Sequence, residues 1–130
     1  QAAVYMIEAH PWTGVGFSNY PPVYEQYRLL NWPMPLGHAH NIYLNVAAET
    51  GLPGLAAYLI LWIAVFGLTV RTLKAQSGVG RGLALGLLGA WVHLSVHHLF
   101  DNLYVDNVHL NIGAMLGLLC ALARTGLSKS

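Results

Sequence analysis

The sequence predicts an all-α fold of polytopic transmembrane helices, joined to a loop outside the membrane that contains short helices. The first observation behind this prediction is the composition: 8% of the 130 residues are charged and 55% are hydrophobic. About a quarter of the residues of an ordinary soluble domain are charged, so this chain cannot cover a globule with a charged surface. The second observation is that three long apolar runs follow one another in the C-terminal part, as expected for a chain whose solvent is lipid. The net charge of +1, together with the lack of a basic patch in the sequence, excludes nucleic acid as a partner.

Residues 1–51 are predicted to form the loop. Prolines interrupt helices in this stretch, because proline lacks an amide hydrogen and fixes φ: Pro11, Pro21, Pro22, Pro33 and Pro35. Tyrosine and tryptophan residues are scattered between them, and both are typical of the membrane–water interface. We therefore expect a folded loop with short helices that lies at the membrane surface and contacts its lipids.

Residues 52–130 are predicted to contain three transmembrane helices. The first covers about 52–70, a run of nineteen uncharged residues that extends about 28 Å as a helix, close to the hydrocarbon thickness of a bilayer. The second and third helices cover about 83–100 and 108–123. Because the chain begins at Gln1, with neither a methionine nor a signal-peptide pattern, we expect it to be a fragment of a larger membrane protein.

The basic residues of the C-terminal part predict the orientation of these helices. They lie in two places, between the first and second spans and after the third: Arg71, Lys74, Arg81, Arg124 and Lys129. The positive-inside rule makes both places cytoplasmic, so the loop of residues 1–51 lies on the opposite, outer side. All five acidic residues and all seven histidines then fall on that outer side or in the outer halves of the spans. Since the groups able to do acid–base chemistry gather there, we expect the functional site at that face.

A polar stripe in the loop contains the strongest candidate residues. In a helix that begins at about Asn41, the side chains of Asn41, Asn45 and Glu49 recur every four residues on one face. His40 then stands at the helix N-terminus, where backbone amides and the helix dipole favour anions. An imidazole beside such an anion site is a candidate general base towards an acceptor hydroxyl. The alternative is that His40 is an interfacial residue satisfied by local hydrogen bonds.

Two sequence segments resemble a known family. His40-Asn41 is followed after nine residues by Gly51-x-x-Gly54, which resembles the signature of the O-antigen ligase family. Upstream, residues 10–20 (HPWTGVGFSNY) resemble the Pro-x-x-Gly-x-Gly segment that precedes the signature in the same superfamily. That superfamily comprises O-antigen ligases, O-antigen polymerases and protein-glycosylating ligases, and this chain resembles their C-terminal part.

The resemblance implies a glycosyltransferase of lipopolysaccharide biosynthesis. Its donor would be a glycan on undecaprenyl diphosphate, and its acceptor a hydroxyl of the lipid A core, of another glycan or of a protein. The resemblance also implies a multi-pass protein of the bacterial inner membrane with a periplasmic active site. Neither a metal nor another cofactor is implied.

The resemblance also implies roles for residues of the loop. The histidine at the position of His40 is implicated in catalysis, and periplasmic arginines are implicated in holding the diphosphate. We assign substrate binding to Arg28, His38, Asn41 and Glu49. Arg28 matches no family arginine by motif, and contact with a lipid headgroup is its alternative role. His38 either forms hydrogen bonds near the site or caps the loop.

A second group of polar residues lies in the predicted second span. His93, His97 and Asp101 are four residues apart, so we expect them on one helical face, where they form a hydrogen-bonded wall of the acceptor cavity. Three such groups are also a possible metal site, and a membrane metal-binding or transport module is therefore an alternative function. An O-antigen or capsular polysaccharide polymerase is the nearest alternative, and a non-catalytic half-protein that needs a partner chain is a third.

Overall fold

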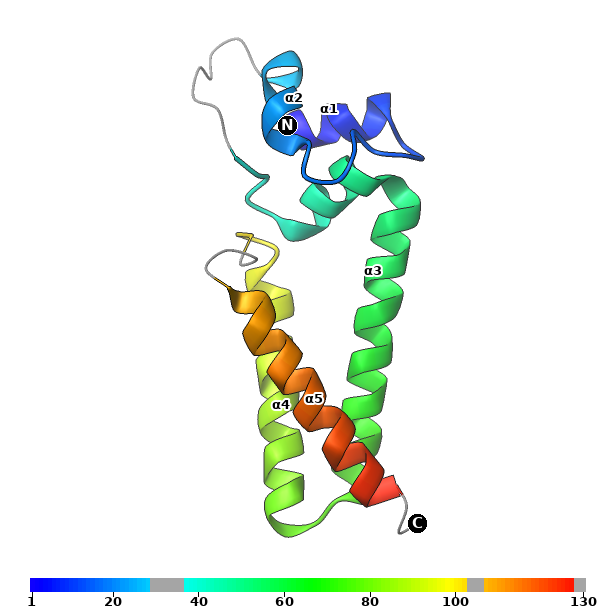
Figure 1. Cartoon of the computed structure of the whole chain (residues 1–130), viewed down its shortest axis with the longest axis vertical. Helices are drawn as coiled ribbons and strands as arrows, with labels where there is room; N and C mark the ends of the chain where they lie inside the picture. Colours follow the sequence, from blue (N-terminus) through cyan, green and yellow to red (C-terminus); the bar gives the residue numbers. More distant parts are fainter. Residues whose placement is uncertain (29–36, 103–106, 128–130) are drawn as a thin grey trace. The chain divides into compact units, whose positions relative to one another are not determined.

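The structure is a computed structural model that describes residues 1–28, 37–102 and 107–127 (Figure 1). Its elements are five helices in these residues: α1 (Ala2–Ala9), α2 (Tyr20–Tyr27), α3 (Ile42–Ala75), α4 (Gly78–His97) and α5 (Val108–Leu127). The described residues contain no strand, and the predicted all-α class is confirmed. The chain divides into two compact units, one of residues 1–60 with 98–102 and one that includes residues 61–97 and 107–127.

Within the described residues, three helices are long and apolar enough to cross a membrane: α3 with 34 residues, α4 with 20, and Val108–Gly126 of α5 with 19. The predicted first span, 52–70, lies inside α3. The predicted second span, 83–100, differs from α4 at both ends, since α4 runs from Gly78 to His97. The two differ because a run of apolar side chains predicts which residues suit lipid, whereas the ends of the helix are set by its backbone hydrogen bonds.

Helix α3 is broken at Gly51, where φ is 73° and ψ is −178°. The break separates a first segment, residues 42–50, from a long second segment, residues 52–75. Pro53 lies in the first turn of the second segment, where proline is tolerated because the amides of a first turn have no partner within the helix. The sequence predicts that Gly51, Pro53 and Gly54 interrupt the helix just before the first span. This prediction is confirmed for Gly51, whereas Pro53 and Gly54 lie inside the second helical segment.

The break exposes backbone groups that the loop after α1 satisfies. The last carbonyls of one helix and the first amides of the next have no partner within their own helix. Three hydrogen bonds supply these partners: Val15 N donates to Ala48 O at 2.9 Å, Gly16 N to Glu49 O at 3.0 Å, and Leu52 N to Pro11 O at 2.8 Å. The loop and the break are thus bound to each other through their backbones.

Two glycines permit this close approach. A Cβ atom added at Gly14, whose φ is +64°, would overlap the backbone of Glu49 and Thr50. A Cβ added at Gly51 would lie 2.6 Å from the carbonyl carbon of Trp12. Each glycine therefore meets the other segment, and the two sequence segments that resemble the family form one backbone-to-backbone contact.

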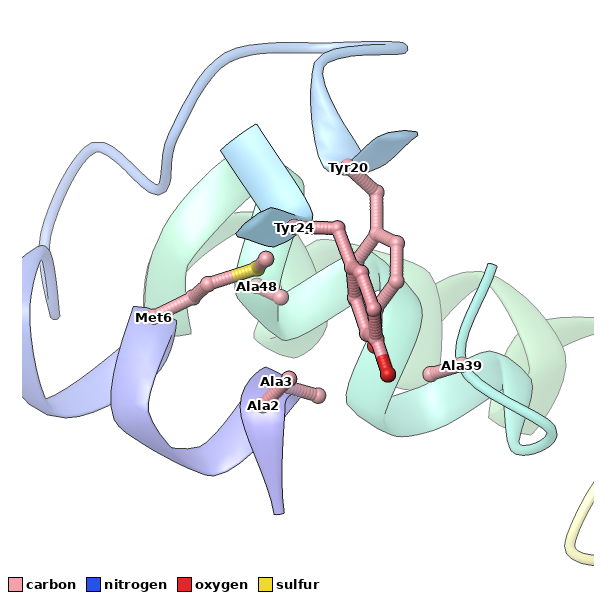
Figure 2. Packing of buried hydrophobic residues seen from close by; sticks show 7 residues of the cluster. All are labelled: Ala2, Ala3, Met6, Tyr20, Tyr24, Ala39 and Ala48. Carbon is pink, nitrogen blue, oxygen red and sulfur yellow. The ribbon is translucent and has the colours of Figure 1, made fainter. Parts of the chain in front are cut away.

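A small apolar core holds the rest of the first unit together (Figure 2). Its buried residues come from α1, α2 and the first segment of α3 with the residues before it: Ala2, Ala3, Met6, Tyr20, Tyr24, Ala39 and Ala48. The rings of Tyr20 and Tyr24 lie side by side, with their centroids 6.1 Å apart. Small alanines around the rings allow α1 and α2 to pack onto the start of α3, and the residues before Ile42 are fixed by this packing.

The second unit has its own apolar core. Trp91 of α4 is fully buried against Val65, Leu87, Ile112 and Leu119, which join α4 to the second segment of α3 and to α5. The Trp91 indole Nε1 donates a hydrogen bond to Thr69 Oγ1 at 3.1 Å. A polar group buried among apolar helices needs such a partner, and this pair fixes the register of α4 against α3.

Candidate functional site

Asn41 positions the candidate site, because it is the N-cap of α3. Its side-chain Oδ1 accepts a hydrogen bond from Leu44 N at 2.9 Å, which satisfies one of the free amides of the first turn. Its Nδ2 donates to Leu99 O at 2.9 Å. Ile42 N donates to His98 O at 3.0 Å, so the start of α3 holds the segment of residues 98–102 by two bonds.

These contacts change one expectation from the sequence. The helix N-terminus beside His40 was expected to bind an anion, but the amides of Ile42 and Leu44 already bond to protein oxygens. They stabilise the helix and the 98–102 segment instead. The position of His40 next to the helix start is as predicted, since the helix begins at Ile42.

The 98–102 segment brings Asp101 to His40. His40 Nδ1 lies 3.1 Å from Asp101 Oδ1, and the two side chains are 58% and 47% exposed. The hydrogen bond from His40, and after it the backbone bond from Asn102 N at 2.8 Å, lower the pKa of Asp101 below its usual value. The carboxylate therefore stays ionised at neutral pH. Because an ionised carboxylate can only accept, His40 Nδ1 carries the proton and donates the hydrogen bond. This fixes the imidazole tautomer and leaves Nε2 as an acceptor that faces away from the carboxylate.

His38 completes the group. Its ring is 5.0 Å from the ring of His40 in an edge-to-face arrangement, and its Nδ1 lies 3.2 Å from Ala39 O. Ligand atoms of His38, His40 and Asp101 all lie within 4.8 Å of one another. The structure therefore gathers three of the predicted site residues at one accessible place.

The other members of the polar stripe bind backbone rather than His40. Asn45 is buried, and its Oδ1 accepts a hydrogen bond from Ala39 N at 3.0 Å. Glu49 is buried as well, and its Oε1 accepts from Tyr20 N at 3.1 Å, in the first turn of α2. Asn41 accepts from Leu44 N in the same way, so each residue of the stripe accepts a hydrogen bond from one backbone amide. The stripe therefore ties α2 and the residues before His40 to α3.

Arg28 is exposed and forms the C-cap of α2. It belongs to the same unit as His40. Asp106, one of the five acidic residues predicted on the outer side, lies outside the described residues.

Asp101 does not continue the helical face of His93 and His97, so this part of the sequence prediction is corrected. Helix α4 ends at His97, and the carbonyls that follow, of His98 and Leu99, accept hydrogen bonds from Ile42 and Asn41. His93 and His97 do lie one turn apart on α4, with ring centroids 5.7 Å apart. The four-residue spacing is helical for the two histidines alone.

The pairing of His40 with Asp101 is the feature that the sequence did not reveal. The two residues are 61 positions apart, and the spacing of Asp101 from His97 suggested a different partner. The available signal was that the positive-inside rule predicts all acidic groups on the outer side of the membrane together with His40.

Residues 1–59 match the family described as O-antigen ligase, which confirms the resemblance carried by the two glycine segments. No curated protein matches the chain. The matched residues cover His38, His40 and both glycine segments. The match ends at residue 59, next to Ile60, the last α3 residue of the first unit. Asp101 lies outside the match.

Proposed function

Because its first 59 residues match the O-antigen ligase family, we propose that this chain is part of a membrane glycosyltransferase in which His40 is the general base. The donor is a glycan linked to undecaprenyl diphosphate, and the acceptor is a hydroxyl of the lipid A core or of another glycan. The site faces the periplasm from the bacterial inner membrane.

The bond between His40 Nδ1 and Asp101 Oδ1, 3.1 Å long, is the observation that carries this proposal. With Nδ1 donating to the carboxylate, Nε2 accepts the proton of the acceptor hydroxyl as its oxygen attacks the anomeric carbon. The bond between that carbon and the diphosphate oxygen breaks, and undecaprenyl diphosphate leaves with the electron pair. Asp101 acts as a positioning residue, because its charge holds the ring in one tautomer and stabilises the imidazolium that forms.

Cationic groups are needed at the leaving diphosphate, since negative charge develops there as the bond breaks. We assign Arg28 to this role. It is exposed at the end of α2, in the unit that contains His40, and a guanidinium can bind two phosphate oxygens at once.

Glycan transfer by membranes that contain the protein tests the proposal. We expect His40→Gln to lower the rate of transfer by about a hundredfold or more. The loss should be the same with lipid A core and with a glycan as acceptor. We expect Asp101→Asn to lower transfer substantially and to change its pH profile, because the wrong tautomer then competes. His109→Gln, at an exposed histidine of α5, is the matched control. Normal transfer by a well-expressed His40→Gln variant would remove the proposed base.

A further inference from the structure

The group of His38, His40 and Asp101 has a second chemical property besides acid–base catalysis. Two imidazoles and one carboxylate are a typical set of protein ligands for an open zinc site, in which the fourth position is left to water. Their ligand atoms lie within 4.8 Å of one another, and all three side chains are at least partly exposed. An ion in solution can therefore reach them without a change in the fold.

The distance between two of these ligand atoms already suits an ion. His40 Nδ1 and Asp101 Oδ1 are 3.1 Å apart. Two ligands of a tetrahedral ion, each about 2.1 Å from it, are separated by roughly 3.4 Å. An ion that replaces the shared proton therefore needs these two atoms to shift by only a few tenths of an ångström. His38 offers the third ligand atom within 4.8 Å of both.

Neighbouring backbone groups hold two of the ligands as they are held in metal sites. His38 Nδ1 donates to Ala39 O at 3.2 Å, which leaves its Nε2 as the metal-binding nitrogen. Asn102 N donates to Asp101 Oδ1 at 2.8 Å. A ring nitrogen bonded to a carbonyl and a carboxylate bonded to an amide are the usual outer contacts that orient ligands towards a metal.

We propose that His38, His40 and Asp101 bind a transition-metal ion of the zinc type, and that the bound ion inhibits glycan transfer by occupying His40. The second half rests on the proposed function of His40 as general base. The ion is an inhibitor and not a cofactor: when it binds Nδ1 of the neutral imidazole, the proton of that nitrogen moves to Nε2, which can then no longer accept the proton of the acceptor hydroxyl. The site also differs from the set of His93, His97 and Asp101 considered from the sequence, since Asp101 lies beside His40.

Calorimetric titration of the purified, chelator-treated full chain with Zn²⁺ tests the first half, with Mg²⁺ as the control ion. We expect one Zn²⁺ per chain. Removal of a direct ligand costs more than removal of an outer contact, so His38→Ala and Asp101→Ala should each weaken binding by about a hundredfold or more. The double variant H93A/H97A is the matched control and should bind as the unchanged chain does. Circular dichroism confirms that each variant keeps its helix content.

Cobalt substitution gives an independent readout. Co²⁺ at this site should give the visible absorption of a four-coordinate ion, and the band should disappear in His38→Ala. Absence of Zn²⁺ binding, or binding that survives both His38→Ala and Asp101→Ala, would overturn the proposal. Binding that is lost only in H93A/H97A would overturn it as well and would locate the ion on α4.

Transfer assays with increasing Zn²⁺ test the second half. We expect transfer to fall in step with occupancy of the site and to return when the ion is removed by a chelator. If Zn²⁺ saturates the site and transfer continues, the metal site stands while inhibition and the role of His40 as base are both refuted. The failure of the metal site and the failure of the proposed function are thus distinguished.

Discussion

A methyl group added at Gly14 tests whether the contact between two backbones holds the first segment of α3. In Gly14→Ala the new Cβ would overlap the backbone of Glu49 and Thr50, and the residue would keep a φ of +64°. The left-handed conformation costs an alanine roughly 1–2 kcal/mol. Separation of the two backbones would also weaken the hydrogen bonds of Val15 and Gly16, each worth about 1 kcal/mol. We therefore expect the first unit to lose about 3–4 kcal/mol of stability.

Two other glycines separate the contributions to this loss. Gly78 has a φ of +53° and no neighbouring atom within 4 Å of an added Cβ, so Gly78→Ala should cost only the conformational 1–2 kcal/mol, roughly. Gly37 also has no atom within 4 Å of an added Cβ and has no left-handed φ. Gly37→Ala should therefore stay within about 0.5 kcal/mol of the unchanged chain.

Hydrogen exchange measured by mass spectrometry in detergent micelles is the assay, because it reports the opening of each segment separately. Peptides from residues 42–50 should exchange much faster in Gly14→Ala, and peptides from the start of α4 only slightly faster in Gly78→Ala. Equal effects of Gly14→Ala and Gly78→Ala on their own segments would refute the reasoning, because the close approach to Glu49 and Thr50 would then contribute nothing.

Three further predictions concern the polar contacts of the first unit. The lowered pKa of Asp101 means that its stabilising contribution is complete above the usual aspartate pKa of about 3.9 and is lost as the pH falls through the lower folded value. Hydrogen exchange around Asp101 should therefore accelerate only in that acidic window, and this acid response should be absent in Asp101→Asn. Glu49→Ala should destabilise the first unit by about 1–2 kcal/mol because the amide of Tyr20 loses its buried acceptor, whereas Glu49→Gln keeps an oxygen there and should retain most of the stability in thermal unfolding. Asn41→Asp should keep the helix cap but lose the bond to Leu99 O, and Asn41→Ala should lose both. The melting temperature should therefore be highest for the unchanged chain, lower for Asn41→Asp and lowest for Asn41→Ala.

The apolar runs predicted the three membrane helices because a span is defined by length and hydropathy, both of which are local properties of the sequence. The break in α3 was predicted for the same reason, since Gly51 marks it directly. The exact end of α4 was not predicted. It depends on bonds from Asn41 and Ile42 to the carbonyls after His97, and no periodicity within the helix contains that information.

The polar stripe shows a different limit. Its positions were predicted correctly, because Asn41, Asn45 and Glu49 follow the helical repeat. Their partners could not be predicted, since amides of Ala39 and Tyr20 have no side-chain signature in the sequence. The chemical pairing of His40 with Asp101 was missed because it joins residues 61 positions apart.

The position of the candidate base, His40, depends on the two glycines through a series of contacts. Gly14 and Gly51 let the loop approach the break and fix the first segment of α3. That segment begins with Asn41, which holds the 98–102 segment and with it the carboxylate of Asp101. The glycines therefore help to position the proposed base. It follows that Gly14→Ala should lower glycan transfer through the fraction of chains with an intact site, and that the remaining transfer should keep the pH profile of the unchanged protein. A changed profile would mean that the glycine acts on the chemistry of His40 itself.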